Sequence, residues 1–246
     1  MQREDLKKYE TDYTELPFEN ILREYRQQNI FNILSTAPHK KILEIGSGPL
    51  PLFRDFNDYE KMVVVEPGET FFKQAKDFAG TDKRIELAND FFENAVDGLV
   101  PETFDFIVIG GFLHEINNPG DVLQAVKKVS NKNTIIHSFV PNANSFHRLL
   151  AFEMGIIKDI YEKSGHDELF NRSEVYNMDS FKKLFTQNGL SVTGAGTYFF
   201  KPFTNGQMDN MLTGNIIGNA VLDGLNKMIK YFPGHGSEMY INSAVN

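Results

Sequence analysis

Short apolar runs occur along the first half of the chain, and amphipathic segments separate them. Short runs rich in Ile and Val are typical of buried strands, whereas apolar residues spaced by three and four indicate helices. Predicted strands cover Lys41–Ile45, Met62–Val65, Ile85–Ala88, Phe104–Ile109 and Thr134–Phe139. Predicted helices between them cover Leu50–Phe56, Glu69–Phe78, Phe92–Leu99 and Pro119–Ser130. Strands that alternate with helices predict a parallel sheet with right-handed crossovers.

The regions on either side of this alternation have their own patterns. Apolar residues at helical spacing predict a helix within 16–37, with Pro38 after it as a stop. After the fifth strand, the turn-forming stretch 141–145 leads into a predicted helix, and 164–177 has the composition of a loop. The helices predicted in this half are Phe146–Ile160, Asp179–Asn188 and Met208–Tyr231, and the strands are Leu190–Ala195 and Glu238–Ala244.

Together these elements predict an α/β fold: a doubly wound, Rossmann-like sheet of seven strands, mostly parallel with an antiparallel last strand. We expect N-terminal helices and an insertion to cover the substrate. The chain is interpreted as one domain over 1–246. Its segments are an N-terminal helical part (1–39), a cofactor-binding core (40–140), a substrate lid or insertion (141–178) and a C-terminal part of the sheet (179–246).

Composition and charge narrow the function. The absence of cysteine excludes disulfides, thiolate metal sites and a cysteine nucleophile. A net charge of −8, with scattered basic residues, disfavours a nucleic-acid substrate, because a phosphate backbone requires a basic face. No apolar run is long enough for membrane insertion, and the charged N-terminus has no signal-peptide pattern. We therefore expect a cytoplasmic location.

A glycine turn, Gly46-Ser47-Gly48, follows the first predicted strand. Glycine allows the backbone to approach a ligand closely and to adopt positive φ without steric cost. Glu66 follows the second strand, about twenty residues later, where a carboxylate can bind a ribose. This spacing predicts a site for a nucleoside cofactor.

The residues of the turn distinguish between two classes of cofactor. A dinucleotide fingerprint requires a third glycine and amide donors for the pyrophosphate, but residues 49–51 are Pro-Leu-Pro. The two prolines lack the amide hydrogens that would bind phosphate. A cofactor without phosphates, such as S-adenosylmethionine (SAM), does not require those donors. The turn therefore favours SAM, and a nucleotide-dependent oxidoreductase is the less favoured alternative.

Four ordered motifs resemble those of the class I SAM-dependent methyltransferases. They are Glu44-Ile45-Gly46-Ser47-Gly48, Val65-Glu66-Pro67, Asn89-Asp90-Phe91, and the run from Phe104 through Gly110 to His114-Glu115. Leu50 departs from the pattern, since the family often has a glycine at that place. The segments after residue 140 are similar to a branch that methylates sugars, cell-surface precursors and other small acceptors. The resemblance implies SAM as cofactor and a small-molecule acceptor, and we expect a monomer or homodimer.

The resemblance also implies a set of cofactor-binding residues. These are Glu44, Gly46, Ser47, Gly48, Glu66, Pro67, Asp90, Phe91 and Gly110. Glu66 would bind the ribose and Asp90 the adenine. A polar residue at the position of Asp90 can instead cap the following helix.

On the acceptor side, His114 and His147 are the candidate catalytic bases, because a neutral imidazole can accept a proton near neutral pH. A structural hydrogen bond is the alternative role for His114. The predicted substrate-binding residues are Asn142, Arg148, His166 and Arg172. Convergence of the basic groups would indicate an anionic acceptor. The spacing of histidines and acids matches no metal motif, so no metal is predicted.

The predicted reaction is transfer of the SAM methyl group to a hydroxyl of a small acceptor that is anionic or carries a sugar or phosphate. The enzyme would mainly align donor and acceptor and exclude water. Two alternatives remain: N- or C-methylation of a small metabolite, and a non-catalytic methyltransferase-like subunit that binds a partner through the 208–231 helix.

Overall fold

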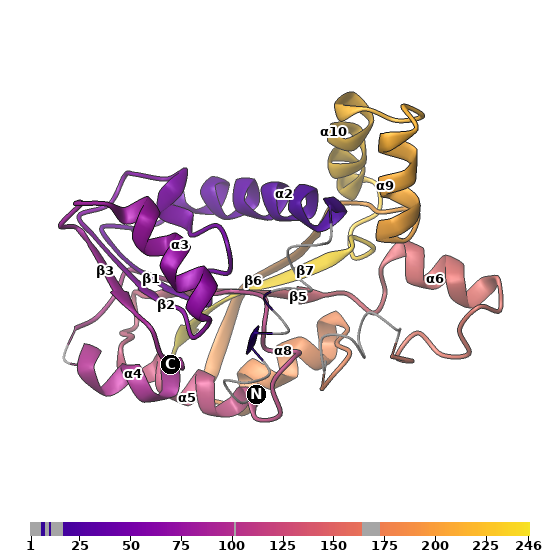
Figure 1. The fold of residues 1–246 in the computed structure, drawn as a ribbon. Helices are drawn as coiled ribbons and strands as arrows, with labels where there is room; N and C mark the ends of the chain where they lie inside the picture. The colour runs from indigo at the N-terminus through magenta and orange to yellow at the C-terminus, as the bar shows by residue number, and fades with distance from the viewer. Residues whose placement is uncertain (1–5, 8–9, 11–16, 101, 164–172) are drawn as a thin grey trace.

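The structure is a computed structural model, and it describes residues 6–7, 10, 17–100, 102–163 and 173–246. Its centre is a seven-stranded sheet with the order β3-β2-β1-β4-β5-β7-β6 (Figure 1). β7 is antiparallel to both of its neighbours, and the other pairings are parallel. The predicted fold class is therefore confirmed. The strands are β1 Lys41–Ile45, β2 Lys61–Val65, β3 Ile85–Ala88, β4 Phe106–Ile109, β5 Ile135–Pro141, β6 Leu190–Tyr198 and β7 Glu238–Val245.

Helices cover both faces of this sheet (Figure 1). They are α2 Pro17–Leu34, α3 Glu69–Ala79, α4 Phe92–Leu99, α5 Pro119–Lys128, α6 Phe146–Glu153, α8 Met178–Gln187, α9 Asn205–Thr213 and α10 Asn219–Lys227, with short 3-10 turns at η1 Leu52–Arg54 and η2 Met228–Lys230. Successive strand residues point to opposite faces. Leu43 and Ile45 accordingly pack in the core with α4, α5 and α8, whereas Ile42 packs in the core with α2, α3 and α10.

The register of the central strands determines where a site can form. Ile45 pairs with Val65 on β2 and with Ile109 on β4, so the three strands end in one row. The residue after each of these ends therefore lies beside its neighbours across the sheet. An open α/β sheet binds its ligand at this carboxyl edge.

Two predicted helices are shorter in the structure. The stretch Leu50–Phe56 forms only the 3-10 turn η1, because Pro51 precedes it and cannot donate a helical hydrogen bond. The helix predicted over Phe146–Ile160 ends at Glu153, and Gly155 follows with a φ of +70°. The positive φ explains the stop, since it takes the chain out of the right-handed helical region.

The single helix predicted over Met208–Tyr231 is wrong. The region contains two helices, α9 and α10, separated by a turn in which Asn215 has a φ of +55°. Gly214 and Gly218 flank this turn, and glycine has low helix propensity. The capping box of Thr204 and Gln207 starts α9 three residues before the predicted beginning.

Within the described ranges, no helix has both the length and the apolar character needed to cross a lipid bilayer.

His137 occupies the middle of β5 and is completely buried. Its Nδ1 lies 2.7 Å from Asn242 Oδ1, and its ring packs against Phe106, Phe139 and Tyr240. In the neutral tautomer Nδ1–H donates to this amide oxygen. Burial lowers the pKa of His137 to about 4, because the charged imidazolium loses its hydration. The side chain is therefore structural and neutral at physiological pH.

Acidification should therefore destabilise the fold through His137. The unfolded imidazole binds a proton below a pKa of about 6.5, whereas the folded one does so only below about 4. The stabilisation is complete above the unfolded pKa and is lost as the pH falls from 6.5 toward 4. From pH 7 to pH 5 the free energy of unfolding should fall by about 2 kcal/mol through this residue. Urea unfolding of the wild type and His137→Phe at both pH values measures this, and an equal pH effect in the variant contradicts it.

Candidate active site

A cavity of ≈ 660 Å³ opens at the carboxyl edge of the sheet. It is lined by the glycine turn after β1, the ends of β2, β4 and β5, one side of α2, and the starts of α4, α6, α9 and β7. Ligand cavities of small-molecule proteins commonly measure about 300–1,000 Å³. The volume suits a nucleoside cofactor together with a small second molecule.

The glycine turn and the turn after β4 touch each other at the floor of the cavity. Gly46 and Gly48 have φ values of +75° and +59°. Gly110 donates its amide to Ile45 O at 2.8 Å, and a Cβ on Gly110 would lie 2.0 Å from Gly46 O. Both turns therefore need glycine: one for its backbone angles, the other for its close approach.

Glu66 is buried at the end of β2 and binds the glycine turn directly. Its Oε2 accepts from Gly48 N at 2.9 Å, and its Oε1 accepts from Gly68 N at 2.8 Å. Ser47 Oγ lies 3.5 Å from the same Oε2. Burial raises the pKa of Glu66 to about 7, against the effect of the two backbone hydrogen bonds. The carboxylate thus lines the cavity in a fixed position.

Glu44 also lines the cavity, but its carboxyl group serves the chain itself. Leu52 N lies 3.0 Å from Glu44 Oε2, which ties the end of the glycine loop back to β1. Burial raises the pKa of Glu44 to about 8, and the nearby charge of Glu66 adds to the shift. Because this pKa lies above 7, Glu44 is mostly protonated at neutral pH and Glu66 carries the ionised carboxylate more readily.

The motif after β3 divides between the cavity and the surrounding scaffold. Phe91 and Pro67 line the cavity, whereas Asp90 is not among the described residues that do. Asp90 Oδ1 accepts from Phe91 N at 2.8 Å and from Asn94 Nδ2 at 3.0 Å. Asn89 Nδ2 donates to Glu66 O at 2.9 Å. In this structure Asp90 thus binds the start of α4, the alternative that its position in sequence left open.

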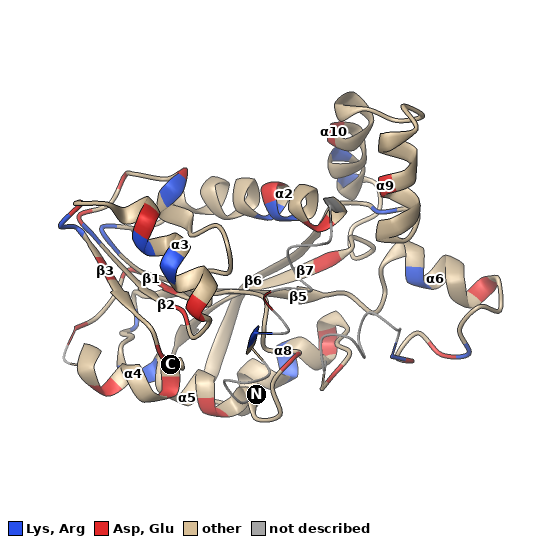
Figure 2. Ribbon diagram, in the orientation of Figure 1, with Lys and Arg blue, Asp and Glu red and all other residues tan. Residues whose placement is uncertain are grey.

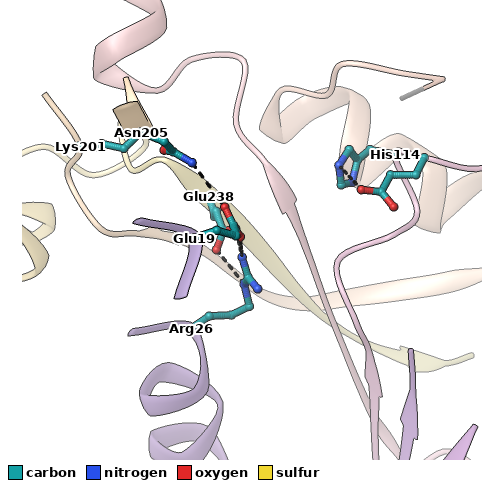
Figure 3. Close-up of polar contacts among 7 residues, drawn as sticks. Glu19, Arg26, His114, Lys201, Asn205 and Glu238 are labelled. Carbon is teal, nitrogen blue, oxygen red and sulfur yellow. Dashed lines mark hydrogen bonds and ion pairs between the residues drawn. The ribbon is translucent and has the colours of Figure 1, made fainter. Parts of the chain in front are cut away.

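His114 stands on the acceptor side of the cavity with Glu115 beside it (Figure 3). His114 Nε2 lies 3.5 Å from Glu115 Oε1, and both side chains are buried. Ser173 N donates to His114 O at 2.8 Å, so the last residues of the 141–178 insertion hold this turn in place. A buried imidazole next to a carboxylate is suited to accept a proton, because the negative charge stabilises the imidazolium.

The other predicted acceptor-side residues are placed differently. His147 and Arg148 line the cavity from α6. Arg148 donates from Nε to Ile160 O at 3.0 Å and from Nη2 to Glu162 O at 2.5 Å, so it holds the segment after α6. Asn142 donates to Gly234 O and Gly236 O, both at 2.9 Å. The predicted residues His166 and Arg172 lie outside the residues that the structure describes.

A stripe of α2 that was not predicted lines the cavity opposite His114. It consists of Glu19, Arg23, Arg26, Gln27 and Ile30. Gln27 Nε2 donates to Leu50 O at 3.0 Å, which ties α2 to the glycine loop. The spacing of these positions, 0, 4, 7, 8 and 11 along a helix, places them on one face. That spacing was the available signal: a helical face that is polar and still buried.

Arg26 connects this stripe to the other end of the chain (Figure 3). Its Nε donates to Glu238 Oε2 at 3.0 Å, and its Nη2 pairs with Glu238 Oε1 and, at 3.0 Å, with Glu19 Oε1. Lys201 Nζ donates to Asn205 Oδ1 at 2.5 Å in the same region. Glu238, Lys201 and Asn205 also line the cavity.

Charges elsewhere are mixed. In the part of the chain that the structure describes, Lys and Arg are interspersed with Asp and Glu along the elements (Figure 2). Among these residues, no group of three or more His, Asp and Glu side chains is arranged to hold a metal ion.

Solved structures with this fold are SAM-dependent methyltransferases. One from Thermotoga maritima, described as a possible histamine N-methyltransferase, matches with a TM-score of 0.62 and 14% identity over 98% of this chain and 100% of its own. The plantazolicin methyltransferase BamL, in complex with a triazolic desmethylPZN analog and S-adenosylhomocysteine (SAH), matches with a TM-score of 0.57 and 14% identity, over 98% and 96%. The N-methyltransferase NodS of Bradyrhizobium japonicum, also with SAH, matches with a TM-score of 0.54 and 12% identity, over 93% and 88%.

These likenesses establish the fold. The chain has the fold of the class I SAM-dependent methyltransferases, as its four motifs indicated. No protein-family model matches the sequence. No curated protein matches it either.

The contact between the two turns predicts that Gly110→Ala is destabilising. The added Cβ would lie 2.0 Å from Gly46 O, a backbone atom that cannot move without displacing the glycine turn. We expect a loss of about 2–3 kcal/mol in the free energy of unfolding. Gly98→Ala on α4 is the matched control, because nothing lies within 4 Å of its added Cβ. Urea denaturation of both variants decides, and equal stabilities contradict the close contact.

Proposed function

We propose that the protein is a SAM-dependent methyltransferase that methylates a hydroxyl group of a small, anionic acceptor. The observation that carries the proposal is the aligned row of Gly46, Glu66 and Gly110 at the floor of the cavity. Two glycine turns that allow close backbone approach flank a buried carboxylate. These are the groups that a phosphate-free nucleoside cofactor requires. The SAM-dependent enzymes that share the fold add support.

In this proposal Glu66 accepts hydrogen bonds from the ribose hydroxyls, and Phe91 packs against the adenine. The turns at Gly46 and Gly110 leave room for the amino-acid part of the cofactor. Bound SAM supplies an electrophilic methyl group on its sulfonium. The chain holds the two reactants in line and excludes water, which can contribute on the order of 7–11 kcal/mol. Because Glu66 is already fixed by Gly48 N and Gly68 N, it would need little reorganisation on binding.

His114 is the proposed base for the acceptor hydroxyl. It lines the cavity near Gly110, and Glu115 beside it would stabilise the imidazolium after proton transfer. His147 is a second candidate that reaches the same cavity from α6. General-base assistance of this kind contributes roughly 10²–10⁴-fold to a rate. Arg148 and Asn142 would act mainly by shaping the wall, since both bind backbone carbonyls.

N-methylation is the second candidate. Glu115 and Glu174 line the acceptor half, and their carboxylates suit an amine better than an anion. Two of the proteins with this fold are described as N-methyltransferases, one of them as possible. Identification of the methylated atom in the product distinguishes the two candidates.

SAM binding tests the cofactor part of the proposal. Glu66→Ala should weaken SAM binding about 100-fold, because hydrogen bonds to a charged group contribute about 1.5–3 kcal/mol. Isothermal titration calorimetry with SAM and SAH gives the affinities. Glu86→Ala on β3 is the control, since that carboxylate is exposed on the sheet edge. If the wild type does not bind SAM, or if both variants bind it equally, the cofactor assignment is wrong.

The role of His114 is tested by methyl transfer. Radiolabelled SAM is incubated with a small-molecule extract, and labelled products are separated and counted. His114→Asn should reduce labelling 10²–10⁴-fold, while SAM affinity remains within about twofold because the residue lies on the acceptor side. A parallel loss of SAM affinity and labelling would indicate that His114 supports the fold instead.

A further inference from the structure

Ser237, at the start of β7, lines the cavity with a hydroxyl that has no hydrogen-bond partner among the described residues. Its residue is only 5% exposed. The backbone at this position is held on both sides: Ser237 N donates to Phe199 O at 2.8 Å, and Ser237 O accepts from Asn142 N at 3.1 Å. A buried hydroxyl without a partner costs free energy, so such a group at a cavity wall is a candidate for ligand binding.

The hydrogen bond to Phe199 places Ser237 against the segment that leads to Lys201. Lys201 is 7% exposed, lines the same cavity and donates to Asn205 Oδ1. Asn205 and Gly206 form the first turn of α9, and they also line the cavity. A helix N-terminus carries partial positive charge. The wall therefore combines a hydroxyl, an ammonium group and a helix N-terminus, all of which favour negative charge.

Two carboxylates face the same region, and their charge must be counted. Glu238 and Glu19 both pair with Arg26, and Asn205 Nδ2 lies 3.5 Å from Glu19 Oε2. Two acids are thus matched by the two cations Arg26 and Lys201, and the described cluster is formally neutral. Because Arg26 already binds both carboxylates, an added anion would bind at the Lys201 side of the cluster.

The position of this cluster separates it from the cofactor row. The glycine turns lie at the ends of β1 and β4, whereas Ser237 starts β7, which is two strands beyond β4 in the sheet. Neighbouring strands lie about 4.8 Å apart, so the separation is on the order of 10 Å. Figure 3 shows Lys201, Asn205 and Glu238 on one side and His114 on the other. A molecule held at the cluster can thus extend toward His114.

We propose that Ser237 and Lys201, with the first turn of α9, bind an oxyanion, such as a carboxylate, of the methyl acceptor. The inference rests on the proposed function and deepens it: the acceptor carries its anionic group at one end and its nucleophile at the other, near His114. Recognition of the anion is thereby assigned to this cluster rather than to Arg148, whose guanidinium holds the carbonyls of Ile160 and Glu162.

The test uses trifluoroacetate as the oxyanion and trifluoroacetamide as its neutral counterpart, followed by ¹⁹F NMR titration of the SAH-loaded protein. The wild type should bind trifluoroacetate at least about tenfold more tightly than the amide, and Ser237→Ala and Lys201→Met should each weaken trifluoroacetate about tenfold. Ser138→Ala is the matched control, because Ser138 Oγ is also buried without a partner but does not line the cavity. It should leave trifluoroacetate binding unchanged.

Several outcomes would overturn the inference. One is no trifluoroacetate binding to the wild type, and another is equal binding of the amide. A third is binding that survives Ser237→Ala and Lys201→Met but is lost in Arg148→Met. A fourth is binding only in the absence of SAH, which would assign the site to the carboxylate of the cofactor. SAH binding is measured first by calorimetry: its failure contradicts the proposed function, and titration of the unloaded protein still reports whether the cluster binds the oxyanion.

Discussion

The parallel register of β1, β2 and β4 is the constraint on which the site depends. Ile45, Val65 and Ile109 end their strands in one row, so the next residues, Gly46, Glu66 and Gly110, become neighbours although the chain separates them widely. A shift of one residue would turn every side chain of a strand to the other face. The two apolar clusters prevent such a shift, because each strand has one set of residues buried on either side. The packing of the sheet thus positions the polar groups at its edge.

This dependence explains why residues 40–140 could be predicted well. Buried parallel strands appear as continuous apolar runs, and each is followed closely by its turn, so strand, turn and side chain are encoded within a few residues. Glu66 could be recognised because its partners Gly48 and Gly68 belong to the same local pattern of turns. Asp90 was harder, since binding a ligand and capping a helix require the same residue type at the same place. Only the geometry shows that it binds Phe91 N and Asn94.

The acceptor side could not be predicted in the same way, because its contacts join distant parts of the chain. Arg26 and Glu238 are 212 residues apart, and neither stands in a motif that points to the other. The α2 helix appeared weakly amphipathic because a buried stripe of polar residues faces the cavity while apolar residues face the sheet. The break between α9 and α10 had a local signal in Gly214 and Gly218, but the apolar spacing on both sides continues across it. Tertiary context decides such cases.

The buried charges of the cavity follow one physical rule. Moving a charge out of water is costly unless hydrogen bonds and opposite charges compensate for it. Glu44 and Glu66 are compensated mainly by backbone amides, and Arg26 by two carboxylates. Groups held in this way stay oriented in the absence of ligand, so a ligand meets dipoles and charges that need little rearrangement. The residues that resisted prediction are therefore those whose orientation depends on compensation by remote segments, and specificity for the acceptor resides where those segments meet.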